Sequence, residues 1–384
     1  MRCLNCHLEE ITASTQICPR CNVHLPSLMH DVLSPGTVIH QGTYRIDYAL
    51  GRGGFGITYQ AVHTTLEKRV AIKEYYPQEH ALRDTSTGNL IVPTAKKDIY
   101  ERGLSRFVTE GKILAKINHP NVVRVENFFE ERGTAYLVME LIDGYTLREK
   151  LNRQPNKKLT NGIEVIISAL VDALATVHAQ GIYHLDIKPD NVLLTSDNRL
   201  VLVDFGASRQ GLNNCTTSQA FTLDYAPPEV LMGKDFGIES DIFELGMMLH
   251  EMIVGELPPR AIDRIFNDNW QENLHPDLIE PWKSLIISAL QLQKHTRPPN
   301  VKQWWRLPQT QTLHQTLQTY CHACNASNPK THKFCTSCGT PLQVAISTNK
   351  QPEQQNYSEV HPDDWTKTQK KGFFKFLGSL LDDN

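Results

Sequence analysis

The segment HLDIKPDN, from His184 to Asn191, and the tripeptide DFG, from Asp204 to Gly206, decide how this chain is interpreted. Upstream lie the glycine-rich GRGGFG, from Gly51 to Gly56, and VAIK, from Val70 to Lys73. Glycines in such a turn let backbone amides approach phosphate oxygens, because no Cβ stands in the way. One of these segments alone is weak evidence. All four in this order form a specific pattern.

With these segments the chain resembles the eukaryotic-like bacterial Ser/Thr protein kinases over roughly residues 44–306. GGFGITY, and KEYYP after VAIK, are closer to bacterial members than to animal ones. The resemblance implies an α+β, two-lobed protein-kinase fold, with residues 44–140 as the small lobe and 143–306 as the large lobe. It also implies ATP-dependent transfer of the γ-phosphate to serine or threonine hydroxyls of protein substrates, including the chain itself, with Mg²⁺ or Mn²⁺.

The resemblance assigns chemical roles to six side chains. Asp186 accepts the proton of the substrate hydroxyl, and Lys188, which Ser/Thr kinases have at this position, stabilises the transferred phosphate. Lys73 contacts the α- and β-phosphates and is held by an ion pair with Glu110 on the following helix. The two magnesium ligands are Asn191 and Asp204.

The resemblance also implies a nucleotide site between the lobes. Met139 is the gatekeeper, and residues 140–142 form the hinge. Thr58 stands where the pattern usually has valine. A glycine loop also opens dinucleotide-binding folds, but here a strand pattern follows it rather than a helix. The nucleotide-binding residues are Leu50, Gly51, Arg52, Gly53, Gly54, Phe55, Gly56, Ile57, Thr58, Ala71, Lys73, Met139, Glu140, Ile142 and Leu193.

Leu185 departs from the family pattern. Kinases that are switched by an activation-loop phosphate usually have arginine there, and leucine cannot bind a phosphate. We therefore expect activity without such a phosphate, although four hydroxyls of the loop are open to modification. The resemblance further predicts that Glu229 pairs with Arg297 and that Asp241 braces the catalytic loop. The four hydroxyls belong to Ser208, Thr216, Thr217 and Ser218.

Eight of the nine cysteines form two sets of paired CxxC turns. Each set offers four thiolates, as a closed tetrahedral zinc site requires. The pattern predicts two zinc ribbons, at residues 1–25 and 320–342, with one structural Zn²⁺ in each. Two disulfides per module are the alternative, which is disfavoured without a sign of export. The first set is Cys3, Cys6, Cys18 and Cys21, and the second is Cys321, Cys324, Cys335 and Cys338.

Linkers are predicted at residues 26–43 and 307–319, and a disordered stretch from residue 343. Phe373, Phe376, Leu377, Leu380 and Leu381 would share one face of a short amphipathic helix, which would touch a membrane surface or a partner groove. The alternative is a tail that packs on its own protein or frays. Residues 84–97 read as an insertion beside the helix that carries Glu110.

Size and charge agree with this interpretation. The 384 residues carry a net charge of −3, which gives no reason to expect nucleic-acid binding, and Lys330 and Lys333 alone make a poor footprint for it. With no signal peptide and no long apolar run, a cytoplasmic location is predicted. The competing function is a pseudokinase scaffold that recruits protein partners through its zinc ribbons. It is disfavoured because Lys73, Asp186 and Asp204 are all kept.

Overall fold

The computed structural model describes residues 3–4, 8, 11–12, 15–29, 31–54, 56–84, 86–197, 199–205, 209–210, 222–306, 318–329 and 332–342, and only the backbone of 209–210, 318–320, 327 and 329. Cys6, Phe55, Gly206 and the four hydroxyls predicted as modification sites lie outside these residues. So do the C-terminal segment from residue 343 and most of the second predicted linker. Among the helices that are described, none is long and apolar enough to cross a membrane.

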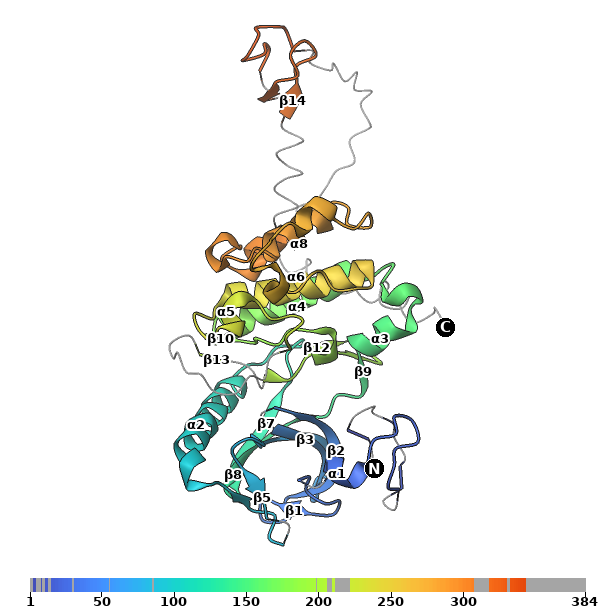
Figure 1. The fold of residues 1–384 in the computed structure, drawn as a ribbon, viewed down its shortest axis with the longest axis vertical. Helices are drawn as coiled ribbons and strands as arrows, with labels where there is room; N and C mark the ends of the chain where they lie inside the picture. The colour runs from blue at the N-terminus through green and yellow to red at the C-terminus, as the bar shows by residue number, and fades with distance from the viewer. Residues whose placement is uncertain are drawn as a thin grey trace, which may run out of the picture.

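A curled six-stranded sheet forms the small lobe (Figure 1). Its strand order is β1-β2-β3-β4-β8-β7, and every neighbouring pair is antiparallel. β4 is buried continuously from Val70 onwards, because it lies inside the sheet between β3 and β8 and because its last residue, Tyr75, packs on Tyr100 and Phe107. The strands are β1 Val38–Ile39, β2 Tyr44–Gly53, β3 Gly56–His63, β4 Lys68–Tyr75, β7 Val125–Glu131 and β8 Thr134–Glu140.

Helix α2, Lys97–Leu114, packs on strands β7 and β8 and carries Glu110. Residues 84–97, expected as an insertion, follow the short strand β5, Leu82–Arg83, which pairs with β6, Leu90–Ile91. The turn between them is fixed by Asp84, whose carboxylate accepts hydrogen bonds from the backbone and hydroxyl of Ser86 at 2.8 and 2.6 Å.

Residues 26–43, predicted as a linker, are folded onto the small lobe instead. They contain most of helix α1, Leu25–Met29, and all of strand β1. The physical reason is apolar burial, because Leu33 and Ile39 both join the hydrophobic cluster of the small-lobe sheet. The segment therefore extends the small lobe beyond the predicted start at residue 44.

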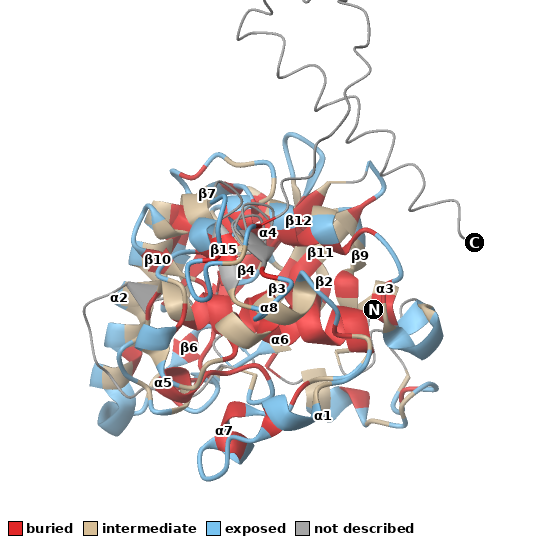
Figure 2. Ribbon diagram, turned by 90° about the horizontal axis from the view of Figure 1, so that it is seen from above, coloured by how far each residue is buried: buried red, intermediate tan, exposed pale blue. Residues whose placement is uncertain are grey.

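The large lobe is mainly helical, and its centre is α6, Ile238–Val254, which is buried from Ser240 to its last residue (Figure 2). α8, Trp282–Ala289, lies against it so closely that a Cβ at Gly246 would stand 2.6 Å from the Cβ of Ala289. α3, Leu147–Arg153, begins with a capping box between Thr146 and Glu149. The remaining helices are α4 Ile163–His178, α5 Pro228–Leu231 and α7 Ala261–Arg264.

Short strands frame the groove between the lobes. The sheet of order β12-β11-β9 carries the catalytic segment at its edge, and β10 pairs with β13. These strands are β9 Gly144–Thr146, β10 Ile182–Tyr183, β11 Val192–Thr195, β12 Leu200–Leu202 and β13 Arg209–Gln210. The two-lobed kinase fold predicted from the sequence is confirmed. Beyond it, β14 Gln318–Tyr320 pairs with β15 Ser327–Pro329 in the C-terminal cysteine module.

Candidate active site

The segment between β10 and β11 gathers polar groups around the carboxylate of Asp186. Lys188 Nζ donates to Asp186 Oδ2 at 2.7 Å, and Asn191 Nδ2 donates to the same oxygen at 2.9 Å. A second hydrogen bond from Asn191 Nδ2, at 2.8 Å, reaches the backbone oxygen of Asp186. The three side chains are neighbours because the chain turns tightly through Pro189–Asn191, a 3₁₀ turn opened by proline.

Thr222 closes the other side of Asp186. Its hydroxyl donates to Asp186 Oδ1 at 2.8 Å and accepts from Lys188 Nζ at 2.5 Å. A hydroxyl therefore already lies within hydrogen-bonding distance of both the carboxylate and the ammonium. The same geometry suits the hydroxyl of a serine or threonine substrate, because a general base must lie within hydrogen-bonding distance of the proton that it accepts.

The expected metal ligands lie at the same place. The amide nitrogen of Asn191 makes both of its hydrogen bonds to Asp186, so the amide oxygen is the atom left to bind a cation. Asp204 forms an ion pair with Lys73 across the groove. The Lys73 ammonium lowers the pKa of the Asp204 carboxyl to about 2. Two oxygen donors, one of them a permanent anion, fit a magnesium ion.

Two acidic side chains of helix α6 hold the catalytic segment in place. Asp241, fully buried, accepts the backbone N–H of His184 at 2.9 Å and that of Leu185 at 2.8 Å, and it also contacts His178 Nε2 at 2.7 Å. One turn further on, Glu244 accepts the N–H of Ile187 at 2.7 Å. Two carboxylates of one helix thus fix three backbone amides on either side of Asp186. Asp241 was predicted for this role, and Glu244 was not.

Glu244 is a buried carboxyl group, 1% exposed, with Asp241 one turn away on the same helix. Burial, and next the charge of Asp241, raise the pKa of Glu244 well above its ordinary value. Burial likewise lowers the pKa of His184, so this imidazole is neutral, with Nε2–H donating to Val203 O at 3.0 Å and Nδ1 accepting the N–H of Asp186 at 3.3 Å. Glu244 and His184 are therefore both favoured in their neutral forms beside Asp186.

Leu185 has a packing role in place of the arginine found in phosphate-switched kinases. It is 2% exposed and joins a small apolar cluster with Ala226 and Val230. The predicted pair of Glu229 and Arg297 is formed, with bonds of 2.6 and 3.1 Å. It is bidentate and buried, and it ties the segment after Thr222 to the large lobe.

A second, partly buried ionic network was not predicted. Arg148 of α3 forms ion pairs with Glu251 of α6 and with Asp190, and it donates to the hydroxyl of Tyr225 at 2.7 Å. The signal that could have revealed it is a carboxylate, Glu251, in an otherwise apolar helical pattern. Glu244 interrupts the same pattern seven residues earlier, which is two turns back on the same face of the helix.

Most of the predicted nucleotide residues lie on the strands of the small-lobe sheet. β2 and β3 meet at a hairpin in which Gly53 pairs with Gly56, and a Cβ on Gly56 would lie 2.2 Å from Glu74 O, so only glycine fits there. Ala71 and Met139 share one apolar cluster, with Leu50 and Ile142 packed against it. Thr58 pairs in register with Lys73. Leu193 lies half-buried in β11 below.

The ion-pair partner of Lys73 within the described residues is Asp204. Glu110 lies half-buried in α2 and has interactions of its own. Its pairing with Lys73 stays a prediction. Arg52, predicted among the nucleotide-binding residues, forms an ion pair with Asp31, 2.7 Å away.

Both cysteine modules bring sulfur atoms together. Sγ atoms of Cys321 and Cys338 are 3.5 Å apart, and those of Cys324 and Cys335 are 3.6 Å apart. Four sulfurs around zinc at about 2.3 Å stand about 3.8 Å from one another, so the set fits a zinc ion. A backbone N–H of Cys338 lowers the pKa of the Cys335 thiol to about 6, which favours the thiolate. In the first module Cys3, Cys18 and Cys21 lie together, and the predicted fourth ligand, Cys6, is outside the described residues.

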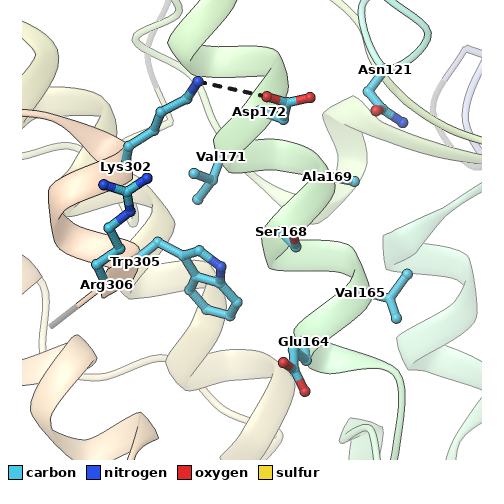
Figure 3. A pocket seen from close by; sticks show the side chains of 10 residues that line it. All are labelled: Asn121, Glu164, Val165, Ser168, Ala169, Val171, Asp172, Lys302, Trp305 and Arg306. Carbon is cyan, nitrogen blue, oxygen red and sulfur yellow. Dashed lines mark ion pairs between the residues drawn. The ribbon is translucent and has the colours of Figure 1, made fainter. Parts of the chain in front are cut away.

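A hollow of about 540 Å³ lies away from this site, between α4 and residues 301–306 (Figure 3). Glu164 and Asp172 line it from α4, and Lys302 faces Asp172 at 3.9 Å. It contains none of the predicted site residues.

Residues 44–306 match the family described as "Protein kinase domain". The chain belongs to the protein kinase family. Residues 320–342 match the family described as "zinc-ribbon domain", so the C-terminal module is a zinc ribbon. Together with the four clustered sulfurs of residues 321–338, this confirms one of the two predicted ribbons.

Relatives of this kinase chain include bacterial proteins. "Probable serine/threonine-protein kinase PknB" of Lactococcus lactis is 30% identical over 259 residues, which cover 64% of this chain and 38% of that protein. "Serine/threonine-protein kinase PknJ" of Mycobacterium tuberculosis is 33% identical, over 59% of this chain and 36% of that protein. The chain thus matches less than half the length of these relatives. A solved structure described as "PpkA-294 apo form" is 28% identical with a TM-score of 0.59, covering 71% of this chain and 98% of that one.

Proposed function

We propose that the chain is an ATP- and Mg²⁺-dependent Ser/Thr protein kinase that phosphorylates protein substrates and itself. The observation that carries this proposal is the convergence of Lys188, Asn191 and Thr222 on the carboxylate of Asp186. Lys73 and Asp204 face each other across the same groove. A pseudokinase scaffold would have no need of this complete arrangement. The names of the bacterial relatives support Ser/Thr specificity.

In the proposed reaction Asp186 orients the substrate hydroxyl and accepts its proton as the oxygen attacks the γ-phosphorus, and the bond from that phosphorus to the bridging oxygen breaks, which releases ADP. The hydroxyl of Thr222 donates to Asp186 Oδ1 in this structure. When the substrate hydroxyl binds, Thr222 either moves away from this oxygen or shares it with the substrate. Lys188 neutralises charge on the transferred phosphate, and Lys73 holds the α- and β-phosphates. Bound between Asn191 and Asp204, a magnesium ion would supply charge neutralisation of the phosphates. Backbone amides of the Gly51–Gly56 turn would cover them.

Asp186→Asn and Lys73→Met test the proposal directly. Each should lower the rate of phosphate transfer from Mg-ATP to a generic basic protein by about 10²- to 10⁴-fold, because one removes the base and the other the phosphate contact. Asp172→Asn and Lys302→Met are matched controls, since both side chains are largely exposed and remote from the groove. Equal, very low incorporation in wild type and in both test variants would favour the scaffold.

Two structural zinc sites form the second part of the proposal, one in each cysteine module. The C-terminal module is supported by its family match and its sulfur geometry. Support for the N-terminal one is the gathering of three sulfurs, with Cys3 and Cys21 3.7 Å apart. We further propose a cytoplasmic location, where free thiols bind zinc rather than form disulfides, and protein partners for the ribbons.

A further inference from the structure

Asp31 lies outside the residues matched to the kinase family, yet it contacts the glycine-rich loop of the kinase domain. Arg52, next to the turn of that loop, places Nη2 2.7 Å from Asp31 Oδ2 and donates from Nη1 to Leu28 O at 3.4 Å. The pair is shielded from water, with side-chain exposures of 16% and 11%. An ion pair so shielded is less screened by salt than an exposed one.

A second arginine, from strand β5, reinforces the same contact. Arg83 donates from Nε to Asp31 O at 2.6 Å and from Nη2 to Glu74 Oε2 at 2.6 Å. The guanidinium carbons of Arg52 and Arg83 lie 5.7 and 5.1 Å from the centre of the Tyr76 ring. Since Glu74 directly follows Lys73 in β4, Asp31 is linked to both strands that face the nucleotide phosphates.

The contact also reaches the N-terminal cysteine module. The side chain of Leu28 packs on the cluster formed by Cys3, Cys18 and Leu25, while its backbone oxygen accepts from Arg52. A change in the cysteine module therefore shifts an atom that is bonded to the glycine-rich loop. No comparable link would exist if residues 26–43 were the flexible linker that the sequence predicts.

We propose that Asp31 is a positioning residue for the glycine-rich loop, which it holds through Arg52, and that it couples the N-terminal cysteine module to ATP affinity. This inference rests on the proposed kinase function. With the pair intact, the loop is fixed near the position that covers the phosphates, so ATP does not have to order it. Without the pair, ATP binding has to supply the free energy that orders the glycine-rich loop, so the affinity for ATP falls. The groups around Asp186 do not change.

The test measures nucleotide affinity and turnover separately in the full-length chain. Asp31→Asn should raise both the Kd for a fluorescent ATP analogue and the KM for ATP by about 3- to 10-fold, with kcat at saturating ATP within about twofold of wild type. Glu126→Gln breaks an ion pair of the same lobe that lies away from the glycine-rich loop and is the matched control. A merely structural role would lower stability and kcat without this split.

Arg52→Gln removes the same ion pair from the side of the glycine-rich loop. It serves as a second variant in case Asp31→Asn alone causes a folding defect. The double variant Asp31→Asn/Arg52→Gln should bind the analogue no more weakly than the weaker single variant, because both remove one interaction. Additive losses, or an unchanged Kd in Asp31→Asn, would overturn the inference.

A separate variant tests the coupling between the N-terminal cysteine module and ATP affinity. Cys3→Ser/Cys18→Ser should raise the Kd by a similar factor, and adding Asp31→Asn should raise it no further. An unchanged Kd in the cysteine variant would overturn the coupling. If wild type binds Mg-ATP and transfers phosphate, and Asp31→Asn binds Mg-ATP with the same affinity as wild type, only this inference is contradicted. A wild-type chain that binds no Mg-ATP contradicts the proposed function and this inference with it.

Discussion

The catalytic loop and the glycine-rich loop of this chain are held in different ways. The catalytic loop lies on α6, where two buried carboxyl groups accept hydrogen bonds from three of its backbone N–H groups. The glycine-rich loop is held by a side chain, Arg52, and its partner, Asp31, comes from a segment outside the kinase match. One loop is fixed by the core of the lobe, and the other by an added segment at its surface.

The difference follows from what each loop has to do. Backbone amides bound to buried carboxylates leave no freedom, which suits a base that must be placed within a fraction of an ångström. A phosphate-covering turn must let nucleotide enter and leave, so it needs a hold that is weaker and replaceable. We expect changes under the catalytic loop to cost fold and chemistry together, and changes at Asp31 to alter affinity alone.

The largest effect is expected at Asp241. In wild type, both carboxylate oxygens of Asp241 accept backbone N–H groups. Asp241→Asn replaces one of these oxygens with an NH₂ group, which cannot accept and leaves one backbone N–H without its partner. The variant should lower the free energy of unfolding by about 3–5 kcal/mol and abolish phosphate transfer. Urea unfolding of the full chain measures it. Asp172→Asn, largely exposed, should change the same quantity by less than about 0.5 kcal/mol. An Asp241→Asn chain that is as stable and as active as wild type would show that the catalytic loop is not anchored by this residue.

A pH-dependent effect is expected at Glu244, whose pKa burial raises. Its protonated form is favoured in the folded state, so this stabilisation is complete below the ordinary carboxyl pKa and is lost as the pH rises towards the raised value. Across that window the free energy of unfolding should fall by up to about 1.4 kcal/mol per pH unit from this group. Glu244→Gln, neutral throughout, should remove that slope.

Urea unfolding of the Glu244→Gln chain and of wild type at several pH values above the ordinary carboxyl range measures the difference. Glu272→Gln, an exposed position, should leave the wild-type slope unchanged. Parallel slopes in wild type and Glu244→Gln would mean that Glu244 is ionised beside Asp241 after all. The catalytic-loop side of the comparison would then rest on Asp241 alone.

The smallest effect is expected from the C-terminal ribbon. Its apolar cluster is Cys321, Cys335 and Leu342, with Ala326 packed against it, and all four belong to the ribbon itself. Cys321→Ser/Cys324→Ser should lose one zinc per chain by elemental analysis while leaving the Kd for ATP within about twofold. The N-terminal pair Cys3→Ser/Cys18→Ser should lose one zinc and raise the Kd. Equal shifts from both pairs would contradict the idea that only the first module is connected to the groove.

Two regions of this chain show where sequence reasoning stopped. Residues 26–43 contain Pro and Gly punctuation, which favours a linker, but Leu33 and Ile39 join the hydrophobic cluster of the small lobe. Burial on a neighbour is not encoded in local periodicity. Glu244 and Glu251 resemble solvated charges of an amphipathic helix until α6 is seen to be enclosed on every side.

The sequence by itself determined which side chains gather around Asp186, because Lys188 and Asn191 lie two and five residues away and one short turn brings them together. It also determined the cysteine pairs, since a CxxC turn aims two sulfurs at one ion. Only the tertiary structure decided the contacts between Lys73 and Asp204, 131 residues apart, and between Asp31 and Arg52. Their energies depend on burial and on which charge meets which across packed elements, and neither quantity is a property of a segment alone.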